Sequence, residues 1–459
     1  MKFSPRPYQR RALQFLLDHP RCNLWLDMGS GKTGVVLAAA DILLDFGEVS
    51  KVLIVAPLRV ALVTWPEEQQ KWTDFRHLDM TVICGIPSER RAQLKTGRIH
   101  VINYELLPWL FEVLGPDWDY DMVVLDESDK VKAHDSIRFK GKAKKPGQKG
   151  HPGLRWARDH VKRWVNMGGT PAPNGEEDLW TQSYFLDPAL LGKTWTAFHE
   201  RFFHRHPYIP QKWIINDGAG AQIRSLLEPY SLTITPKDFL DLPPLVETVH
   251  SVPFDDAETR RYRKLQKDFF LRLDEGGEKL VAQAMNLSQA LLQYTSGFLY
   301  REDGTHSIEH TYKLDALADL VEAARGPVII VHHFQAERDM ILDRLPQTVV
   351  LDKAPETIER WNRGEIPVLL LHPASAGHGL SLQHGGNQMI FFSVDWNLGN
   401  YLQVIERIGP MRQFQSQLDR PCFVHYLIAP GSIDELVLQR LQTKAEVQDL
   451  IKQQMKKSA

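Results

Sequence analysis

Short apolar runs alternate with amphipathic stretches along most of the chain. Runs of three to six apolar, often β-branched residues in the first half are 23–26, 52–56, 81–84, 100–103, 122–125 and 164–167. Comparable runs in the second half are 328–331, 349–351, 368–371, 389–393 and 423–427. This alternation is typical of βα units on parallel sheets that are buried on both faces. The pattern therefore predicts an α/β protein with two parallel sheets flanked by helices.

The segment between these two sets of runs has a different pattern. Residues 176–300 are rich in aromatic and charged side chains, and helical spacing is clear over 257–273 and 277–294. The turn-like sequence LDLPPL at 240–245 predicts a hinge, because paired prolines continue neither a helix nor a central strand. We expect lobe 1 over 1–242, with a helical insert from about 176. Lobe 2 is expected over 243–459, with leading helices at 254–300 and a C-terminal amphipathic brace helix at 444–457.

Composition narrows the class of protein. The chain has 459 residues, of which 43% are hydrophobic and 24% charged, which is typical of folded globular domains. Cys22, Cys84 and Cys422 are far apart, which argues against a disulfide framework and a structural zinc site. Apolar runs stay shorter than the roughly 18–20 residues that span a bilayer, and the start MKFSPRPYQRR lacks the apolar region of a signal peptide. We therefore expect a cytoplasmic protein with no membrane partner.

A net charge of 55 − 57 = −2 hides a strongly basic segment. Residues 130–163, the basic loop, hold twelve Lys and Arg against Asp135 and Asp159, a local +10 that leaves −12 elsewhere. Such asymmetry indicates a polyanionic partner. The alternative is a solvated flexible loop, since its sequence GKAKKPGQKGHPG is rich in Gly, Pro and Lys.

A glycine-rich turn follows the first apolar run. Leu24–Leu26 leads into DMGSGKT at 27–33 and then into an apolar helical stretch. Small residues let backbone N–H groups wrap phosphates, while Lys32 suits the β/γ-phosphates and the Thr33 hydroxyl suits Mg²⁺. Leu26 stands at the first glycine position of the strict phosphate-loop pattern. The competing dinucleotide fingerprint, spelled by Gly29, Gly31 and Gly34, requires an acidic residue about 20 positions on, but the next strand ends Val-Ala-Pro.

Paired carboxylates follow another apolar run. Asp126 and Glu127 come directly after 122–125, at the end of a strand where open α/β sheets bind ligands. An acid in this place is often only a helix cap. Together with Lys32 and Thr33, however, the pair predicts that Asp126 holds Mg²⁺ through a water molecule and that Glu127 orients and deprotonates the attacking water. The expected reaction is ATP hydrolysis.

The order of these motifs resembles that of superfamily two helicase-type ATPases, relatives of the DEAD/DEAH-box helicases, and specifically the Swi/Snf-related branch. The resemblance covers about residues 5–430 and rests on RPYQ at 6–9, APL at 56–58 with TW at 64–65, DES at 126–128, GGTPAPN at 168–174, YTSGF at 294–298, 328–334, ASAGHGLSL at 374–382, DWN at 395–397, Gln403 and ERIG at 406–409. It implies two RecA-like P-loop NTPase lobes, with ATP in the cleft between them and DNA as the track.

The resemblance also implies roles for individual residues. Gln9 would contact adenine, Thr170 would couple ATP to DNA, and Gln403 and Arg407 would reach ATP from lobe 2. Residues of the phosphate loop and of the segment at 374–382 complete the expected nucleotide site: Met28, Gly29, Ser30, Gly31, Lys32, Thr33, Gly34, Gly377 and Gly379.

Departures from the family pattern concern three features. Asp129 stands where the DEAH-type box has His, and Pro410 stands where a second arginine is expected, with Arg412 two residues later. The arginine that stabilises the transferring phosphoryl group is therefore Arg412 or Arg407. The chain also lacks room for chromatin-reading modules, and such compact versions resemble those that bacteriophages encode.

Several residues are candidates for contact with nucleic acid. The loop lysines are Lys140, Lys142, Lys144 and Lys145, and weaker candidates are Arg59, Thr64 and Ser375. Aromatic residues of the insert could stack on bases, but packing of the insert is the favoured interpretation for Trp195, Phe198, Phe202 and Phe203. His332, His333 and His372 suggest a metal, although ordinary strand histidines explain them better.

Together these features predict a DNA translocase or helicase that hydrolyses ATP with Mg²⁺ and works as a monomer, in the host cytoplasm if the protein is viral. The alternative is an ATP-gated scaffold on single- or double-stranded DNA that recruits a phage nuclease or replication protein. An intact set of Lys32, Thr33, Asp126 and Glu127 argues against that alternative.

Overall fold

The structure is a computed structural model that describes residues 1–26, 29–143, 150–169, 172, 175–205, 213–234, 240–274, 280–301, 303–352, 354–375 and 380–443, without the side chains of 268–274 and 280–287. The chain divides after Asp241 into two compact units, called unit 1 and unit 2 below. The brace helix expected at 444–457 lies outside the described residues.

Unit 1 is built on a parallel sheet. Its described strands, in spatial order, are β3 (Met80–Ile83), β4 (Ile99–Asn103), β2 (Val52–Ala56), β5 (Met122–Asp126), β6 (Arg163–Gly168), β1 (Arg21–Leu26) and β9 (Ser231–Ile234). The six apolar runs of the first half are all strands, as expected. Strand β9 was not foreseen, because it is a four-residue edge strand in which only Leu232 and Ile234 are buried.

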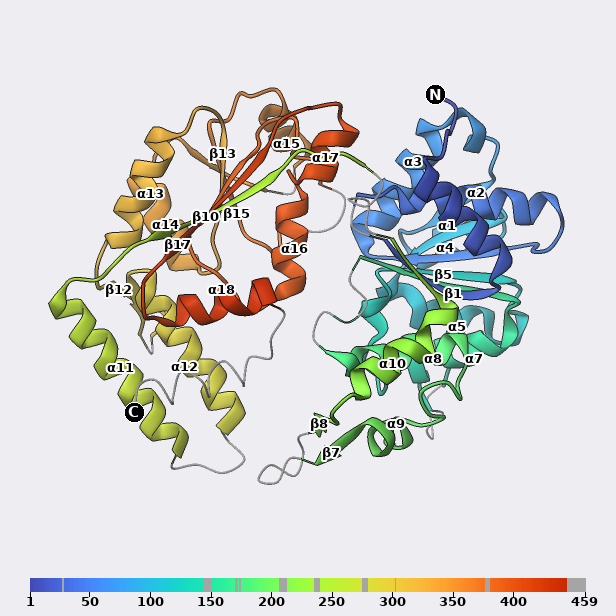
Figure 1. Cartoon of the computed structure of the whole chain (residues 1–459). Coiled ribbons are helices and arrows are strands. Elements are labelled where there is room, and N and C mark those ends of the chain that lie inside the picture. The colour runs from blue at the N-terminus through green and yellow to red at the C-terminus, as the bar shows by residue number, and fades with distance from the viewer. Residues whose placement is uncertain are drawn as a thin grey trace. The chain divides into compact units, whose positions relative to one another are not determined.

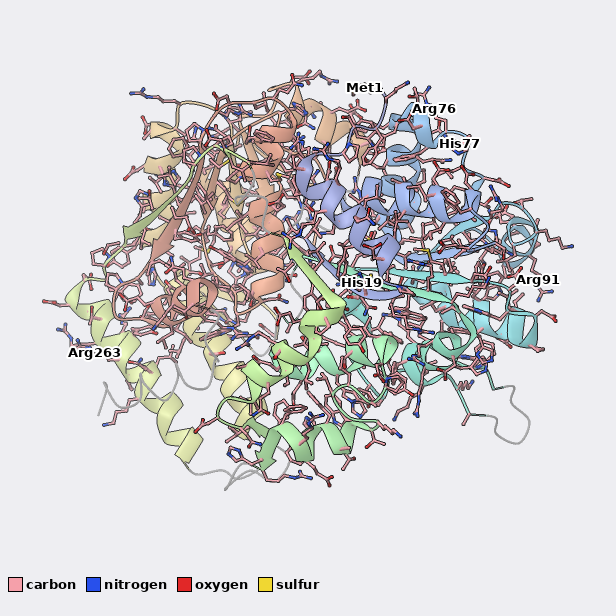
Figure 2. The ribbon with its side chains drawn as sticks, turned by 45° about the vertical axis from the view of Figure 1, so that its right-hand side comes forward. Met1, His19, Arg76, His77, Arg91 and Arg263 are labelled. Atoms are coloured by element: carbon pink, nitrogen blue, oxygen red, sulfur yellow. The ribbon has the colours of Figure 1, made fainter. Side chains whose placement is uncertain are left out.

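Helices cover both faces of this sheet (Figure 1), with α1 and α2 on the face opposite to α5 and α8. Described helices of unit 1 are α1 (Pro7–Asp18), α2 (Lys32–Asp45), α3 (Trp65–Lys71), α4 (Pro87–Gln93), α5 (Leu107–Leu114), α6 (Ile137–Lys140), α7 (Leu154–Ala157), α8 (Leu179–Leu186), α9 (Trp195–Phe202) and α10 (Ala219–Leu227). The N-terminal segment packs beside the turn after α3, where Thr73 N donates to Met1 O (2.9 Å). Figure 2 shows Met1 on the same side of unit 1 as Arg76 and His77.

The aromatic insert is a packed structure. Phe198 and Phe202 on α9 are fully buried, and Phe203 begins the hairpin of β7 (Phe203–Arg205) and β8 (Trp213–Ile215). Trp195 is partly buried and stacks on the His134 ring at 4.2 Å. Packing, and not base stacking, is therefore the confirmed interpretation of these aromatic residues.

The expectation of one continuous basic loop over 130–163 was wrong, because its described residues include the short helices α6 and α7. A narrow neck lies between these two helices. Lys142 and His151 exchange backbone hydrogen bonds of 2.8 and 3.0 Å. Gly141 has a φ of +83°, and a Cβ there would lie 2.4 Å from His151 O, so only glycine fits. Lys140 and Lys142 are exposed at this neck, whereas Lys144 and Lys145 lie outside the described residues.

Unit 2 contains a second parallel sheet. Its described strands, in spatial order, are β10 (Leu245–Ser251), β17 (Cys422–Ile428), β16 (Gln388–Phe391), β13 (Val328–Val331), β15 (Val368–Leu371) and β14 (Thr348–Val350). Apolar runs of the second half account for all of these except β10, which starts directly at the end of the LDLPPL turn. The fold class expected from the sequence, two RecA-like lobes with parallel sheets and flanking helices, is confirmed.

The central strands β13, β15 and β16 of unit 2 are buried on both faces, because their alternate residues enter different cores. Ile329 and Val331 of β13 pack with α11 (Asp256–Asp274), α12 (Leu280–Thr295), α15 (Pro355–Asn362), α16 (Leu398–Glu406) and α18 (Ile433–Thr443). Val328 and Ile330 pack with α13 (Tyr312–Ala323) and α14 (Gln335–Arg344). The antiparallel pair of β11 (Phe298–Tyr300) and β12 (His306–Ile308) follows α12. Both leading helices expected at 254–300 are therefore present.

A buried ion pair joins distant segments of unit 2. Lys313 Nζ on α13 lies 2.6 Å from Asp434 Oδ2 on α18, and both side chains are at most 1% exposed. Asp434 also accepts hydrogen bonds from Thr295 Oγ1 (2.8 Å) and from Ala429 N (3.1 Å). The carboxylate thus connects the end of α12, helix α13 and the start of α18.

No helix in the described part of the chain combines the length and the apolar character that crossing a membrane requires.

Candidate functional site

The glycine-rich turn of unit 1 joins β1 to α2. Gly29 and Gly31 have φ values of +73° and +79°, which side-chain-bearing residues rarely adopt. Helix α2 begins at Lys32, so the first backbone N–H groups of a long helix follow this turn directly. Such N–H groups and the positive end of the helix dipole favour an anion.

The turn is held from below by α1. Tyr8 Oη and Gln9 Nε2 each donate a 3.0 Å hydrogen bond to Ser30 O. Gln9 Oε1 also accepts a hydrogen bond from Arg6 N at 2.9 Å. An amide has two N–H groups and two acceptor sites, and the contacts of Gln9 with described residues use one of each. Sequence analysis placed Tyr8 in the RPYQ motif but did not predict its contact with the turn, for which the signal was its place next to Gln9 on a helix with an apolar buried face.

Lys32 and its neighbours have distinct contacts. Lys32 Nζ donates to Leu26 O (2.8 Å), so Leu26, the residue that breaks the strict motif, anchors the lysine through its backbone. A Cβ on Gly34 would lie 2.8 Å from the Phe3 ring, which indicates close packing of α2 against the N-terminal segment. Met28 lies outside the described residues.

Asp126 and Glu127 stand at the carboxyl end of β5. Asp126 is 6% exposed, and burial raises its pKa to about 7. The Glu127 carboxylate also raises this pKa, while the Lys32 ammonium and a hydrogen bond from Trp65 act against the rise. Glu127 has a φ of +57°, a strained conformation of the kind that concentrates at functional sites. Burial and the Glu127 charge also raise the pKa of Asp129 to about 6.

Two aromatic side chains support this acidic turn. Trp65 Nε1 donates to Asp126 Oδ2 (3.0 Å), and Tyr104 Oη donates to Asp126 O (2.8 Å). Both aromatic side chains are buried, Trp65 completely. Sequence analysis placed Trp65 in a motif but did not predict its contact with Asp126, because residues 61 positions apart meet only when β2 and β5 pair.

A buried polar chain runs from the acidic turn into the sheet. Ser128 Oγ donates to Gln182 Oε1 (2.7 Å), and Asn166 Nδ2 donates to Gln182 O (3.0 Å). Asn166 Nδ2 also donates to Asn23 Oδ1 (2.8 Å), which joins β6 to β1. These bonds fix the acidic turn relative to the strand that leads to 168–174. Thr170 lies outside the described residues.

The residues around the phosphate loop fit a magnesium ion bound together with a nucleotide. Their oxygen donors, the Thr33 hydroxyl and the Asp126 carboxylate, suit Mg²⁺, and the buried Ser30 Oγ has no hydrogen-bond partner among the described residues. The described residues contain no group of three or more His, Cys, Asp or Glu that could hold a metal ion. Mg²⁺ usually takes one or two carboxylates, waters and substrate phosphates, so this donor set suits a nucleotide-bound ion.

Three candidate residues of unit 2 lie on or directly after α16 and on α17 (Pro410–Gln415). Gln403 is half-buried on α16, and Arg407, which is 3% exposed, donates from Nη1 to Leu380 O (3.3 Å). Pro410 starts α17, and Arg412 is half-buried on that helix. Proline at a first helical position explains why a new helix begins where the family pattern expects an arginine. Gly377 and Gly379 lie outside the described residues.

The remaining nucleic-acid candidates lie on turns at the carboxyl ends of strands. Arg59 and Thr64 are half-buried beyond β2 in unit 1, and Ser375 is exposed beyond β15 in unit 2.

In unit 2, Glu337 Oε2 accepts hydrogen bonds from His333 N (2.7 Å) and Ser393 Oγ (2.9 Å), and the Ser393 hydroxyl in turn contacts His333 Nδ1 at 2.9 Å.

A phosphate loop after β1, carboxylates after β5 and a second RecA-like lobe define the class of two-lobed P-loop ATPases. The sequence matches the SNF2-related domain over residues 8–296, so the chain belongs to this family of ATP-hydrolysing, helicase-type enzymes.

Relatives agree with this family. Putative protein p41 of Acyrthosiphon pisum secondary endosymbiont phage 1 is 38% identical, over 99% of both chains. The putative ATP-dependent helicase/translocase YwqA of Bacillus subtilis is 23% identical over 98% of this chain and 49% of its own length. The human DNA annealing helicase and endonuclease ZRANB3 is 25% identical over 96% of this chain. This chain spans only 40% of ZRANB3.

The fold has a counterpart among solved structures. The Pyrococcus furiosus Hef helicase domain is similar with a TM-score of 0.56 and 12% identity, over 94% of this chain and 97% of that one. This likeness concerns the fold.

Proposed function

We propose that the protein is an ATP-dependent DNA translocase that hydrolyses ATP to ADP and phosphate and moves along DNA to remodel or unwind it. The observation that carries this proposal is the grouping of a glycine turn, Lys32 and the Asp126–Glu127 pair at the carboxyl ends of β1 and β5, two parallel strands that both pair with β6 in one sheet. DNA as the track is supported by the SNF2-related family and by the name of the relative ZRANB3.

Residues of unit 1 bind and activate the substrate in this proposal. The backbone of Gly29–Gly31 and the start of α2 bind the phosphates, and Lys32 exchanges its bond to Leu26 O for the β/γ-phosphates. Thr33 and Asp126 hold Mg²⁺, which when bound neutralises charge on the phosphates. Glu127 orients the attacking water and accepts its proton. Gln9 contacts adenine through its remaining donor and acceptor sites.

Residues of unit 2 complete the ATP site. Gln403, Gly377 and Gly379 contribute to nucleotide binding, and an arginine stabilises charge on the transferring phosphoryl group. Arg412 is favoured over Arg407 for this role, because the Arg407 guanidinium is buried and bonds to the backbone at Leu380. Thr170 couples the nucleotide state to DNA.

Binding of DNA involves the loop lysines, with Arg59, Thr64 and Ser375 on the backbone of the nucleic acid. The exposure of Lys140 and Lys142 at the neck of the basic loop supports this assignment. We place the protein in the cytoplasm of a bacterial host as a monomer, a location that its relation to a phage protein supports.

The experiment that tests the proposal is a steady-state ATPase assay with no nucleic acid, single-stranded DNA, duplex DNA or RNA. We compare wild type with Glu127→Gln and with Glu112→Gln, a matched control on the exposed side of α5. Stimulation by DNA that Glu127→Gln abolishes and Glu112→Gln retains supports the motor. ATP turnover without stimulation by any polymer contradicts translocation and favours a DNA-bound scaffold that recruits another protein.

A further inference from the structure

The chain between β2 and α3 contains an unusual backbone turn. Residues Val60–Thr64 form a π-helical turn that continues directly into α3 at Trp65. Turns of this kind are rare in proteins, but those that occur often lie at functional sites. The extra residue in such a turn changes the direction of the side chains that follow. Here the first side chain after the turn is Trp65.

The Trp65 side chain is fixed in the core of unit 1. It is completely buried, and its Nε1 donates to Asp126 Oδ2 at 3.0 Å. Tyr104 Oη donates to the backbone oxygen of Asp126, so the backbone of this residue is held as well. A carboxylate rotates easily about its last torsion, but a hydrogen bond from an immobile indole restricts that rotation.

We propose that Trp65 is a positioning residue for Asp126, whose indole N–H orients the carboxylate toward the magnesium ion of a bound magnesium–nucleotide. The inference rests on the proposed function, since it requires Asp126 to be a metal ligand. In this proposal the π-helical turn directs the Trp65 indole across the β2–β5 pair toward the acidic turn. Groups that orient metal ligands contribute substantially to metal affinity, and their loss typically costs 10–100-fold.

A closely matched control lies directly after the same helix. Trp72, the residue after α3, also donates its indole N–H to a carboxylate, Glu68 Oε1, at 2.7 Å. Trp65→Phe and Trp72→Phe therefore make the same chemical change, loss of an indole–carboxylate hydrogen bond, but only the first affects Asp126.

The test measures the affinity of a fluorescent ATP analogue for the full chain in magnesium and in EDTA. The ratio of these affinities, the magnesium gain, reports on metal binding without depending on turnover. We expect Trp65→Phe to reduce the magnesium gain about tenfold and to leave the affinity in EDTA within about twofold. Trp72→Phe should keep the magnesium gain of wild type. In an Asp126→Asn background, Trp65→Phe should change the gain by less than about twofold, because the two residues act together.

Several results would overturn the inference. One is an unchanged magnesium gain in Trp65→Phe, and another is an equal loss in magnesium and EDTA, which indicates a purely structural role. The inference would also fail if Trp72→Phe lost as much magnesium gain as Trp65→Phe. It would fail as well if Trp65→Phe reduced the magnesium gain in the Asp126→Asn background as strongly as in wild type. If Trp65→Phe does not fold, benzothienylalanine at position 65 supplies a ring of similar shape without the N–H. A wild type that binds the nucleotide without any magnesium gain contradicts the proposed metal site itself, a result distinct from failure of the positioning role.

Discussion

Removal of one member of the buried Lys313–Asp434 pair should destabilise unit 2 strongly. Lys313→Met keeps the length of the side chain and removes its charge, which leaves the Asp434 carboxylate with Thr295 Oγ1 and Ala429 N as hydrogen-bond donors. Asp434→Asn makes the opposite change and leaves the Lys313 ammonium buried beside a neutral amide. Because both side chains are at most 1% exposed, water cannot compensate for either loss.

The magnitude follows from this burial. Breaking a buried pair costs about 3–5 kcal/mol, a large part of the ~5–15 kcal/mol by which a domain is stable. The double variant contains no unpaired buried charge at this site. We therefore expect it to be more stable than either single variant, with a coupling free energy of about 2–4 kcal/mol.

The assay is hydrogen–deuterium exchange of the full chain in increasing urea, with peptides from α13 and α18 reporting on unit 2. Peptides from the sheet of unit 1 serve as the internal reference, because a single unfolding free energy is poorly defined for a chain of two units. The control is Arg344→Met on α14, which breaks an exposed ion pair with Asp315 on α13, the helix that carries Lys313. This change should cost less than about 1 kcal/mol. Single variants that each cost below about 1 kcal/mol, or costs that add in the double variant, would refute the reasoning.

Further predictions concern catalysis, DNA binding and pH. Arg412→Ala should reduce ATP turnover at saturating ATP by about 10³-fold or more if this arginine stabilises the transferring phosphoryl group, and near-normal rates in both Arg412→Ala and Arg407→Ala would refute a finger at either position. Charge reversal of the loop lysines should weaken DNA binding and flatten its salt dependence while ATP affinity is unchanged; equal DNA affinity in a salt titration would contradict this. Burial lowers the pKa of His332 and His333 to about 4, below the unfolded value of about 6.5, so unit 2 should lose stability as the pH falls from 6.5 to 4. Urea titrations at several pH values in this range give the dependence of the unfolding free energy on pH. His333→Asn should make this dependence less steep, and an unchanged pH dependence would contradict a role of His333 in it.

The parts of the structure that could be predicted from sequence are those with strong local patterns. Buried strands such as β2 and β5 are uninterrupted apolar runs, which need no knowledge of their neighbours. Strand β10 was not predicted for the opposite reason: its residues are all partly buried or exposed, and the preceding LDLPPL turn suggested only a hinge. Edge strands carry a weak hydrophobic signal because one side of them faces solvent.

The candidate site shows the same division. Lys32, Thr33, Asp126 and Glu127 could be named as candidates from the sequence, because each stands in a short contiguous motif. The contacts of Tyr8 and Trp65 were not, since each depends on packing between elements that are distant in sequence. Gly34 illustrates a further difficulty: one glycine fits both a phosphate-binding motif and close packing against Phe3, and sequence alone does not separate these requirements.

The pairing of β10 with β17 has a consequence for how the protein is made on the ribosome. Unit 1 has all its described strands once Ile234 emerges, because β9 completes its sheet. Among the described strands of unit 2, the first pairs with the last, with Leu245 beside Cys422 and Ser251 beside Ile428. Synthesis proceeds at roughly 5–20 residues per second, so β17 is completed about 10–35 s after β10. During that interval the nascent chain carries β10 as an unpaired strand after unit 1 is complete. Protection of this strand from aggregation therefore depends on translation speed and on chaperones that bind exposed strands.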